Sequence, residues 1–380
     1  VRLRLHEALP GMPDDARIVL DGQDDTVFRR VIEDSLFREI AHLEAQGITQ
    51  LGPANYLALS GGGEDGAFGA GILTGWTKEG TRPEFKIVTG VSTGALMAPF
   101  AYLGSAYDEA LRKLYTEINQ DSVMRSRGFL EALIGDSLYD SRPLQEMIRR
   151  ALTTNVIDDI AREYRDKGRL LMVATTNLDV PVGVLWNIGA IAASGEPASV
   201  DLIVQVLLAS ASIPGAFPPV MIRFDHDGRS YEEMHVDGGA ITQVMLYPGT
   251  LSLGNLAPAL LRRIAGRKRH LWIIRNSRMG RRFQPVERSA YQITSRALNT
   301  LIATQGVGDL YQLYVLAERD HLAYRVAYIP SEFDRKPNDL FDPVYMRALF
   351  EFGQAYIQSG DAWHDYPPGY SPKSLYSPAR

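Results

Sequence analysis

Short apolar runs alternate with longer helical segments along most of this chain. Residues 56–60 form an apolar run that predicts a short buried strand, and residues 66–78 predict a helix. A second unit follows at once, with a strand expected at residues 85–89 and an apolar helix at residues 95–103. Further segments of the same alternation lie at residues 170–175, 182–186, 202–209, 231–236 and 270–274, with a helix near residues 288–301. The pattern predicts an α/β fold with a mainly parallel sheet.

The two ends of the chain have a different pattern. Residues 1–52 are polar and contain one expected amphipathic helix at residues 26–46, while residues 365–380 are rich in Pro, Ser and Tyr and predict an extended tail. The apolar positions of that helix are Val27, Val31, Leu36, Ile40 and Leu43. We therefore expect a lead-in of residues 1–52, a main domain of residues 53–364 and a tail of residues 365–380.

Charge and composition narrow the classes of partner. The 380 residues carry a net charge of -5, which gives no broad cationic surface and argues against nucleic acid as a partner. No run reaches the roughly 18 apolar residues that a membrane-spanning helix needs, although peripheral contact with a lipid surface stays open. The chain has no cysteine, so disulfides, thiolate metal sites and cysteine nucleophiles are all excluded. Nothing in the composition fixes the oligomeric state.

A glycine-rich loop directly follows the first predicted strand. Gly61, Gly62 and Gly63 precede Gly66, where the next helix opens, so several backbone N–H groups can converge on a negative charge there. The stretch also fits G-x-G-x-x-G, which makes a nucleotide-binding or anion-binding protein the natural alternative. That alternative needs a carboxylate about 20 residues on, at the end of the next strand, where this chain has Val88-Thr89-Gly90.

The end of that next strand carries the sequence G-x-S-x-G. Gly90 and Gly94 flank Ser92 at a strand-to-helix junction, a placement typical of a nucleophile elbow. Ser92 and the glycine loop thus follow neighbouring strands, whose carboxyl ends meet at one edge of a parallel sheet. The alternative interpretation is that the glycines only permit tight turns and that Ser92 caps the following helix. The pairing of the two motifs favours the catalytic interpretation.

A serine nucleophile needs a proton acceptor beside it. Asp237, followed by Gly238 and Gly239, ends a predicted strand and is the best placed carboxylate, although Asp-Gly alone is a common turn. His235 lies two residues earlier on the same strand, and we interpret it as a packed core histidine. A triad in which His235 or His321 is the base remains the alternative.

These motifs in this order resemble the patatin-like phospholipase family. The Gly-Gly-Gly loop, the G-x-S-x-G elbow and the Asp-Gly-Gly turn occur in the family's order, and residues 209–219 are similar to its Pro-rich segment before the aspartate. The resemblance covers roughly residues 56–247. It implies a three-layer α/β/α patatin-like fold over residues 53–364, and hydrolysis of carboxylic esters of lipids as the activity.

The resemblance also assigns roles. Ser92 would be the nucleophile and Asp237 its only side-chain base, while the amides of Gly61, Gly62 and Gly63 would form the oxyanion hole, with neither metal nor cofactor required. Relatives of this type are often secreted or bound to the bacterial envelope, which suggests that location for this chain. Apart from the resemblance, the apolar residues 128–134, with Leu138 and Tyr139, are typical of ordinary helix packing or, alternatively, of an interfacial flap over the acyl pocket.

One position departs from the family pattern. The loop usually carries Arg or Lys just before its last glycine, whereas here Glu64 and Asp65 precede Gly66. Two acids beside an oxyanion site should repel phosphate, which favours esters of neutral lipids over phospholipids. The alternative is that both carboxylates point outward from the helix start and favour its dipole.

Overall fold

The apolar runs predicted as strands come together in one large sheet. In the computed structural model, residues 9, 11–22, 25–126, 137–226, 228–280 and 285–371 are described. Residues 128–134, considered as a flap, and residues 372–380 of the tail lie outside them. The order across the sheet is β1 (Arg17–Leu20), β7 (Val182–Asn187), β6 (Leu170–Asn177), β3 (Ile87–Val91), β2 (Ala54–Leu59), β10 (Arg269–Arg278) and β11 (Ala323–Ile329).

The centre of the sheet is parallel and one side is antiparallel. The five strands from β6 to β11 run parallel to one another, while β7 and β1 continue the sheet in antiparallel fashion. A hairpin of β8 (Val220–His226) and β9 (Arg229–Asp237) joins through an antiparallel pairing of β9 with β6. The predicted α/β class with a mainly parallel central sheet is confirmed.

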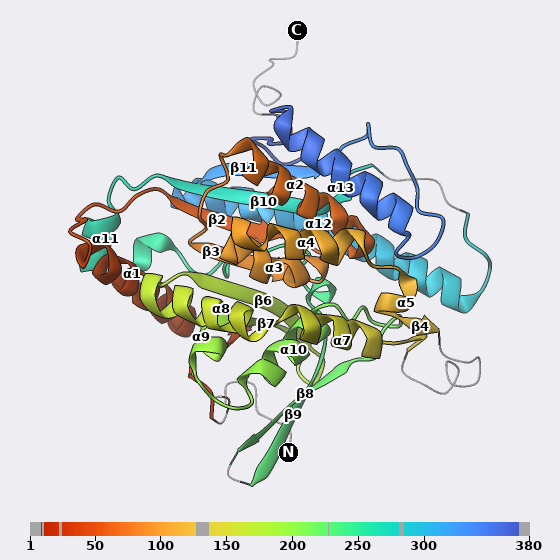
Figure 1. Ribbon diagram of the computed structural model, residues 1–380, viewed down its shortest axis with the longest axis horizontal. Coiled ribbons are helices and arrows are strands. Elements are labelled where there is room, and N and C mark those ends of the chain that lie inside the picture. Colours follow the sequence, from red (N-terminus) through yellow and green to blue (C-terminus); the bar gives the residue numbers. More distant parts are fainter. Residues whose placement is uncertain are drawn as a thin grey trace.

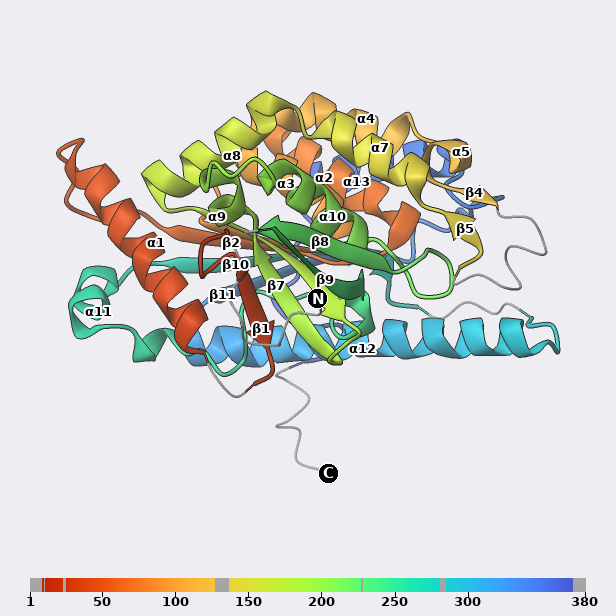
Figure 2. The ribbon, with the colours of Figure 1, turned by 90° about the horizontal axis from the view of Figure 1, so that it is seen from below.

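Helices cover both faces of the sheet (Figures 1 and 2). One layer holds α2 (Gly66–Glu79), α3 (Thr93–Leu103), α4 (Asp108–Thr116), α7 (Arg142–Ala151), α8 (Thr154–Lys167), α10 (Ser199–Ser210) and α13 (Pro343–Gln358). The other holds α1 (Thr26–Glu44), α11 (Pro258–Ile264) and α12 (Ala290–Asp320). The short helix α5 (Gln120–Val123) packs against α7, and α9 (Ile188–Ala193) packs against α8 and α10. The architecture is therefore the expected three-layer α/β/α arrangement.

The strand alternation explains why the sheet is buried on both faces. Leu57 and Leu59 of β2 pack into the core beneath α2 and α3, whereas Tyr56 and Ala58 pack into the core on the α1 and α12 side. Parallel strands covered by helices on both sides read as continuous apolar runs, as this one does. The two cores hold the carboxyl ends of β2, β3 and β6 side by side.

Several elements differ in detail from the expectation. The lead-in contributes β1 to the sheet as well as the expected helix. The helix expected near residues 288–301 runs from Ala290 to Asp320 and contains Gly306 and Gly308. Among the described residues, none of the helices combines the length and apolar character needed to cross a bilayer.

Candidate active site

Ser92 occupies the sharp turn between β3 and α3. Its backbone has a φ of 55° and a ψ of -125°, a conformation that costs a non-glycine residue about 1–3 kcal/mol. Gly94 allows the turn, because a Cβ there would overlap the Leu59 carbonyl oxygen at the end of β2. The Ser92 amide donates to Ser210 Oγ at 3.0 Å, and Ser210 Oγ donates to the Ala174 carbonyl at 2.7 Å. These contacts hold Ser92 at the carboxyl edge of the sheet.

The sheet topology brings Asp237 to the same point. β3 pairs with β6 up to the pair Val91 and Ala174, and β9 takes over as the partner of β6 from the pair Thr175 and Asp237. Because β7 occupies the other edge of β6, the end of β9 meets the end of β3. The last residue of β9 is Asp237, and the residue after β3 is Ser92. The two side chains predicted to act together therefore come from strands that meet end to end.

The carboxyl group of Asp237 is buried and its proton affinity is changed. Burial raises the pKa of Asp237 to about 7, while hydrogen bonding from the Ser92 side chain and the Gly239 amide opposes the rise. The Gly239 amide donates to Asp237 Oδ1 at 2.7 Å. Asp237 Oδ2 has no well-formed hydrogen bond to any described residue, so Ser92 lies beside the carboxylate without being fully aligned on it. Catalytic hydrogen bonds are often loose before substrate binds.

Of the two histidines considered as alternative bases, His235 is engaged by other residues and His321 lies on another part of the fold. His235 is fully buried, with Nε2 3.0 Å from Glu233 Oε2 and Nδ1 2.9 Å from Thr175 Oγ1. Burial lowers the pKa of His235, although Glu233 opposes the change. His321 follows the end of α12, in the other helical layer. The surroundings of His235 are those of a core histidine, as interpreted from the sequence.

The glycine loop lies against Ser92 with part of its backbone free. A Cβ at Gly61 would lie 3.2 Å from the Ser92 Cβ, so the loop and the serine are in close contact. The Gly61 amide donates to the Gln243 carbonyl at 3.0 Å and is already used. The amides of Gly62 and Gly63 have no acceptor among the described residues. Of the three amides predicted as oxyanion donors, that of Gly61 is therefore engaged within the protein, and those of Gly62 and Gly63 are not engaged by any described residue.

Asn276, at the end of β10, braces this loop and was not found from the sequence. Its amide donates to Ser60 Oγ at 2.8 Å, its side chain donates to the Ser60 carbonyl at 2.9 Å, and its Oδ1 accepts from the Gly69 amide at 3.0 Å. A Cβ at Gly62 would overlap the Asn276 carbonyl oxygen. The close approach of Gly62 to the protein's own backbone explains why this position is glycine. A bound nucleotide is not needed to explain it.

Gln243 joins the glycine loop to the aspartate turn and was also missed. Its carbonyl accepts from Gly61, its side chain donates to the Gly239 carbonyl at 3.1 Å, and its own amide donates to Asp309 Oδ2 at 2.6 Å. Asp309 belongs to α12, far away in sequence. No motif spacing marks either residue, because the contact depends on how the layers pack.

The remaining glycines of the predicted motifs lie in the same region. Gly66 is the first residue of α2, Gly90 lies in β3, and Gly238 and Gly239 form the turn after Asp237. Among the residues that the structure describes, there is no group of three or more His, Asp or Glu side chains placed to hold a metal ion.

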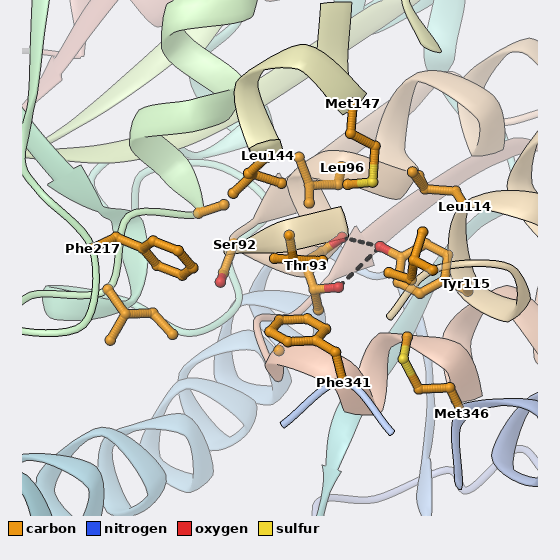
Figure 3. A pocket seen from close by; sticks show the side chains of 15 residues that line it. Ser92, Thr93, Leu96, Leu114, Tyr115, Leu144, Met147, Phe217, Phe341 and Met346 are labelled. Atoms are coloured by element: carbon orange, nitrogen blue, oxygen red, sulfur yellow. Dashed lines mark hydrogen bonds between the residues drawn. The ribbon is translucent and has the colours of Figure 1, made fainter. Parts of the chain in front are cut away.

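An apolar pocket opens at Ser92 (Figure 3). It encloses about 500 Å³ of space between atoms, part of it open to solvent. Its lining is almost wholly apolar: Gly63, Ser92, Thr93, Leu96, Leu114, Tyr115, Ile118, Val123, Leu144, Met147, Ala211, Ile213, Phe217, Phe341 and Met346. In the view of Figure 3, Ser92 and Phe217 lie at one end, and Leu114, Met147 and Met346 lie toward the other.

Glu64 and Asp65 hold the start of α13. Glu64 Oε2 accepts from the Phe341 amide at 2.6 Å, and Asp65 Oδ1 accepts from the Tyr345 hydroxyl. Burial raises the pKa of Glu64 to about 7. Neither carboxylate lines the pocket at Ser92. Their contacts give each a structural role that the sequence did not indicate.

A comparison with protein-family models matches the part of the chain that contains this site. Residues 57–246, half of the chain, match the model of the family described as Patatin-like phospholipase. The glycine loop, Ser92 and Asp237 all lie inside the matched segment. No curated protein is similar enough in sequence to count as a match.

Two solved structures show a distant likeness. VipD from Legionella pneumophila has a TM-score of 0.38 and 12% identity, covering 82% of this chain and 67% of its own. The type III effector protein ExoU has a TM-score of 0.38 and 13% identity, covering 84% of this chain and 56% of its own. This chain therefore spans only part of the length of either protein.

Proposed function

Because this chain belongs to the patatin-like phospholipase family, we propose that it hydrolyses carboxylic esters of lipids, with Ser92 as nucleophile and Asp237 as its only side-chain base. The observation that carries the proposal is a buried carboxylate, with its pKa raised to about 7, beside a serine in a strained turn at the mouth of an apolar pocket. A base with a pKa near the working pH is the most effective one.

The first half of the reaction forms an acyl-enzyme. Asp237 takes the proton of the Ser92 hydroxyl as Oγ attacks the ester carbonyl carbon, and the carbonyl oxygen becomes an oxyanion. The amides of Gly62 and Gly63, which have no acceptor of their own, donate to that oxyanion. The carbon–oxygen bond to the alcohol then breaks, and Asp237 gives its proton to the departing alkoxide.

The second half releases the fatty acid. Asp237, again ionised, takes a proton from a water molecule, whose oxygen attacks the acyl carbon of the ester on Ser92. The bond to Ser92 Oγ breaks and Asp237 returns the proton to the serine. The carboxylate is thus the base and then the acid in each half, so the cycle needs no imidazole.

The pocket and its surroundings fit a lipid substrate. An acyl chain entering from Ser92 would lie between Leu96 and Phe341 and end near Met147, in an almost wholly apolar lining. Because Glu64 and Asp65 are engaged by the start of α13 and do not line this pocket, they give no reason to exclude a phospholipid.

The proposal is tested by hydrolysis of p-nitrophenyl esters of increasing acyl length, run beside phospholipid vesicles. We expect release of p-nitrophenol and of free fatty acid, with kcat/KM rising as the chain grows to fill the pocket. Absence of hydrolysis for every ester and every vesicle would contradict the proposal. Nucleotide-dependent thermal stabilisation in its place would favour the binding-protein alternative.

The far end of the pocket should set the acyl length. In Met147→Trp, the larger ring would fill the space near Leu114 and Met346. We expect the ratio of kcat/KM for p-nitrophenyl laurate to that for the butyrate to fall by roughly tenfold or more. Met147→Leu, which conserves volume, is the matched control and should keep the wild-type ratio. Equal losses on both esters in Met147→Trp would place the acyl chain elsewhere.

The glycine loop provides a further test. Gly62→Ala puts a methyl group onto the Asn276 carbonyl, so the loop must shift and its amides leave the oxyanion position. We expect kcat to fall about 100-fold, the order of loss seen when one oxyanion donor is removed. Gly63→Ala is the control: its φ of 58° strains alanine, but the space around it is open, so the loss should be much smaller. Wild-type activity in Gly62→Ala would show that the amides of the glycine loop take no part in the reaction.

A further inference from the structure

The N-terminal half of α12 projects beyond the sheet. α12 contains 31 residues and is about 46 Å long, whereas the strand that follows it, β11, has 7 residues and spans about 23 Å. Figure 2 shows the helix extending past the sheet on the side of α5 and β4. Residues 290–305 are called the overhang below.

The overhang lies at the same edge of the sheet as Ser92. α12 follows β10, which runs parallel to β2 and β3, so its N-terminal end lies beyond the carboxyl ends of these strands. The overhang begins where the helix leaves the active-site scaffold: a Cβ at Gly306 would lie 3.1 Å from the Gln243 side chain, and Asp309 accepts from the Gln243 amide. The helix therefore leads outward from the site.

The two halves of α12 differ in burial. In the C-terminal half, Leu310, Leu313 and Leu316 are buried in the core. In the overhang, Ile293 is 54% exposed and Leu301 is 68% exposed. Ile293, Ala297 and Leu301 are spaced four residues apart and share one face of the helix. Among the described residues, this apolar face is therefore left largely uncovered.

We propose that this apolar face of the overhang rests on a lipid surface and brings Ser92 to its substrate, an inference that rests on the proposed function. The charge pattern favours lipid. Although the whole chain has a net charge of -5, the overhang carries one basic residue, Arg296, and no acidic residue. A helix with an apolar face and basic residues, lying in the plane of the interface, is the usual form of a peripheral lipid contact. Anionic headgroups add to the attraction.

The area of the face argues against a second copy of this chain. From Ile293 to Leu301 the face is about 12 Å long and roughly 10 Å wide, which is far below the roughly 800 Å² per partner of a stable protein interface. Insertion into a lipid interface needs only a few apolar side chains beside basic residues. The lipid surface is therefore the occupant that fits.

The test compares flotation with vesicles and two assays of hydrolysis. The probe is vesicles of phosphatidylcholine and phosphatidylglycerol, and the variant is the double substitution Ile293→Asp and Leu301→Asp. We expect the vesicle-bound fraction and the hydrolysis of vesicle lipid to fall about tenfold or more, with hydrolysis of soluble p-nitrophenyl butyrate unchanged. Val315→Asp is the matched control, because Val315 is 66% exposed on the C-terminal half of the same helix. It should behave as wild type in all three assays.

Three results would overturn the inference. The double variant could float as well as wild type, it could lose the soluble ester activity to the same extent, or light scattering could show a wild-type dimer that the double variant abolishes. Flotation does not require catalysis, so it can be repeated with Ser92→Ala. If that protein floats while wild type hydrolyses no ester, the proposed function fails and the lipid contact stands.

Discussion

Replacing Ser92 by alanine is expected to lower kcat/KM for p-nitrophenyl butyrate by at least about 10⁴-fold, the order of loss when a serine nucleophile is removed. Without Oγ no acyl-enzyme forms, and what remains is the contribution of the oxyanion donors and of substrate binding. The fold should be unaffected. Alanine carries the same backbone strain at a φ of 55°, and the hydrogen bond from the residue 92 amide to Ser210 is retained.

The measurement is paired with covalent labelling. A fluorophosphonate should add one label to wild type and none to Ser92→Ala. Ser210→Ala is the matched control, because this buried serine lies next to the site but its hydroxyl only links the Ser92 amide to the Ala174 carbonyl. It should lose about 1 kcal/mol of stability and still take the label at Ser92. If Ser92→Ala takes the label, or keeps nearly wild-type turnover, another residue is the nucleophile.

Replacing Asp237 by asparagine is expected to lower kcat about 10³-fold or more, the upper part of the range for a general base. The amide has nearly the same shape, and its oxygen can still accept from the Gly239 amide, as Oδ1 does now. It cannot take a proton from Ser92. His235→Gln is the control, because His235 contacts Glu233 and Thr175 rather than Ser92. If His235→Gln lost as much activity, the triad alternative would be correct.

The same substitution should raise the thermal unfolding temperature at pH 8. Burial raises the pKa of Asp237 to about 7, so the folded state holds this proton more tightly than the unfolded state. The raised pKa therefore contributes its full stability only below pH 4, near the pKa of the unfolded state. This contribution is lost as the pH rises from about 4 to 7, and it stays lost above pH 7. Asparagine is neutral throughout and removes that cost. If Asp237→Asn loses most of its activity but gains stability, the loss of activity cannot result from unfolding and must result from the missing base.

That Ser92 and Asp237 lie at one edge of the sheet was predictable from sequence, because Ser92 directly follows one strand and Asp237 ends another. Parallel strands deliver their carboxyl ends to one edge, so Ser92 after β3 and Gly61 to Gly63 after β2 had to be neighbours. Asp237 was identified by its place before two glycines and by resemblance, but its route to Ser92 was not visible. It depends on β9 replacing β3 as the partner of β6, which is a matter of antiparallel pairing.

The supporting residues could not be predicted, because they act through contacts between distant segments. Asn276 reaches the glycine loop from β10, and Gln243 is fixed by Asp309 from α12. The engagement of the Gly61 amide by Gln243 follows from the same packing. Glu64 was interpreted from its charge alone, whereas its partner, the Phe341 amide, is nearly 280 residues away.

The most direct test of a carboxylate acting on the serine is the pH dependence of the rate at which a fluorophosphonate labels Ser92. In wild type, the rate should rise with pH through an apparent pKa near 7, as Asp237 ionises. This rise should disappear in Asp237→Asn and remain in His235→Gln. A rise that survives in Asp237→Asn and disappears in His235→Gln would show that an imidazole is the base, and would contradict the account.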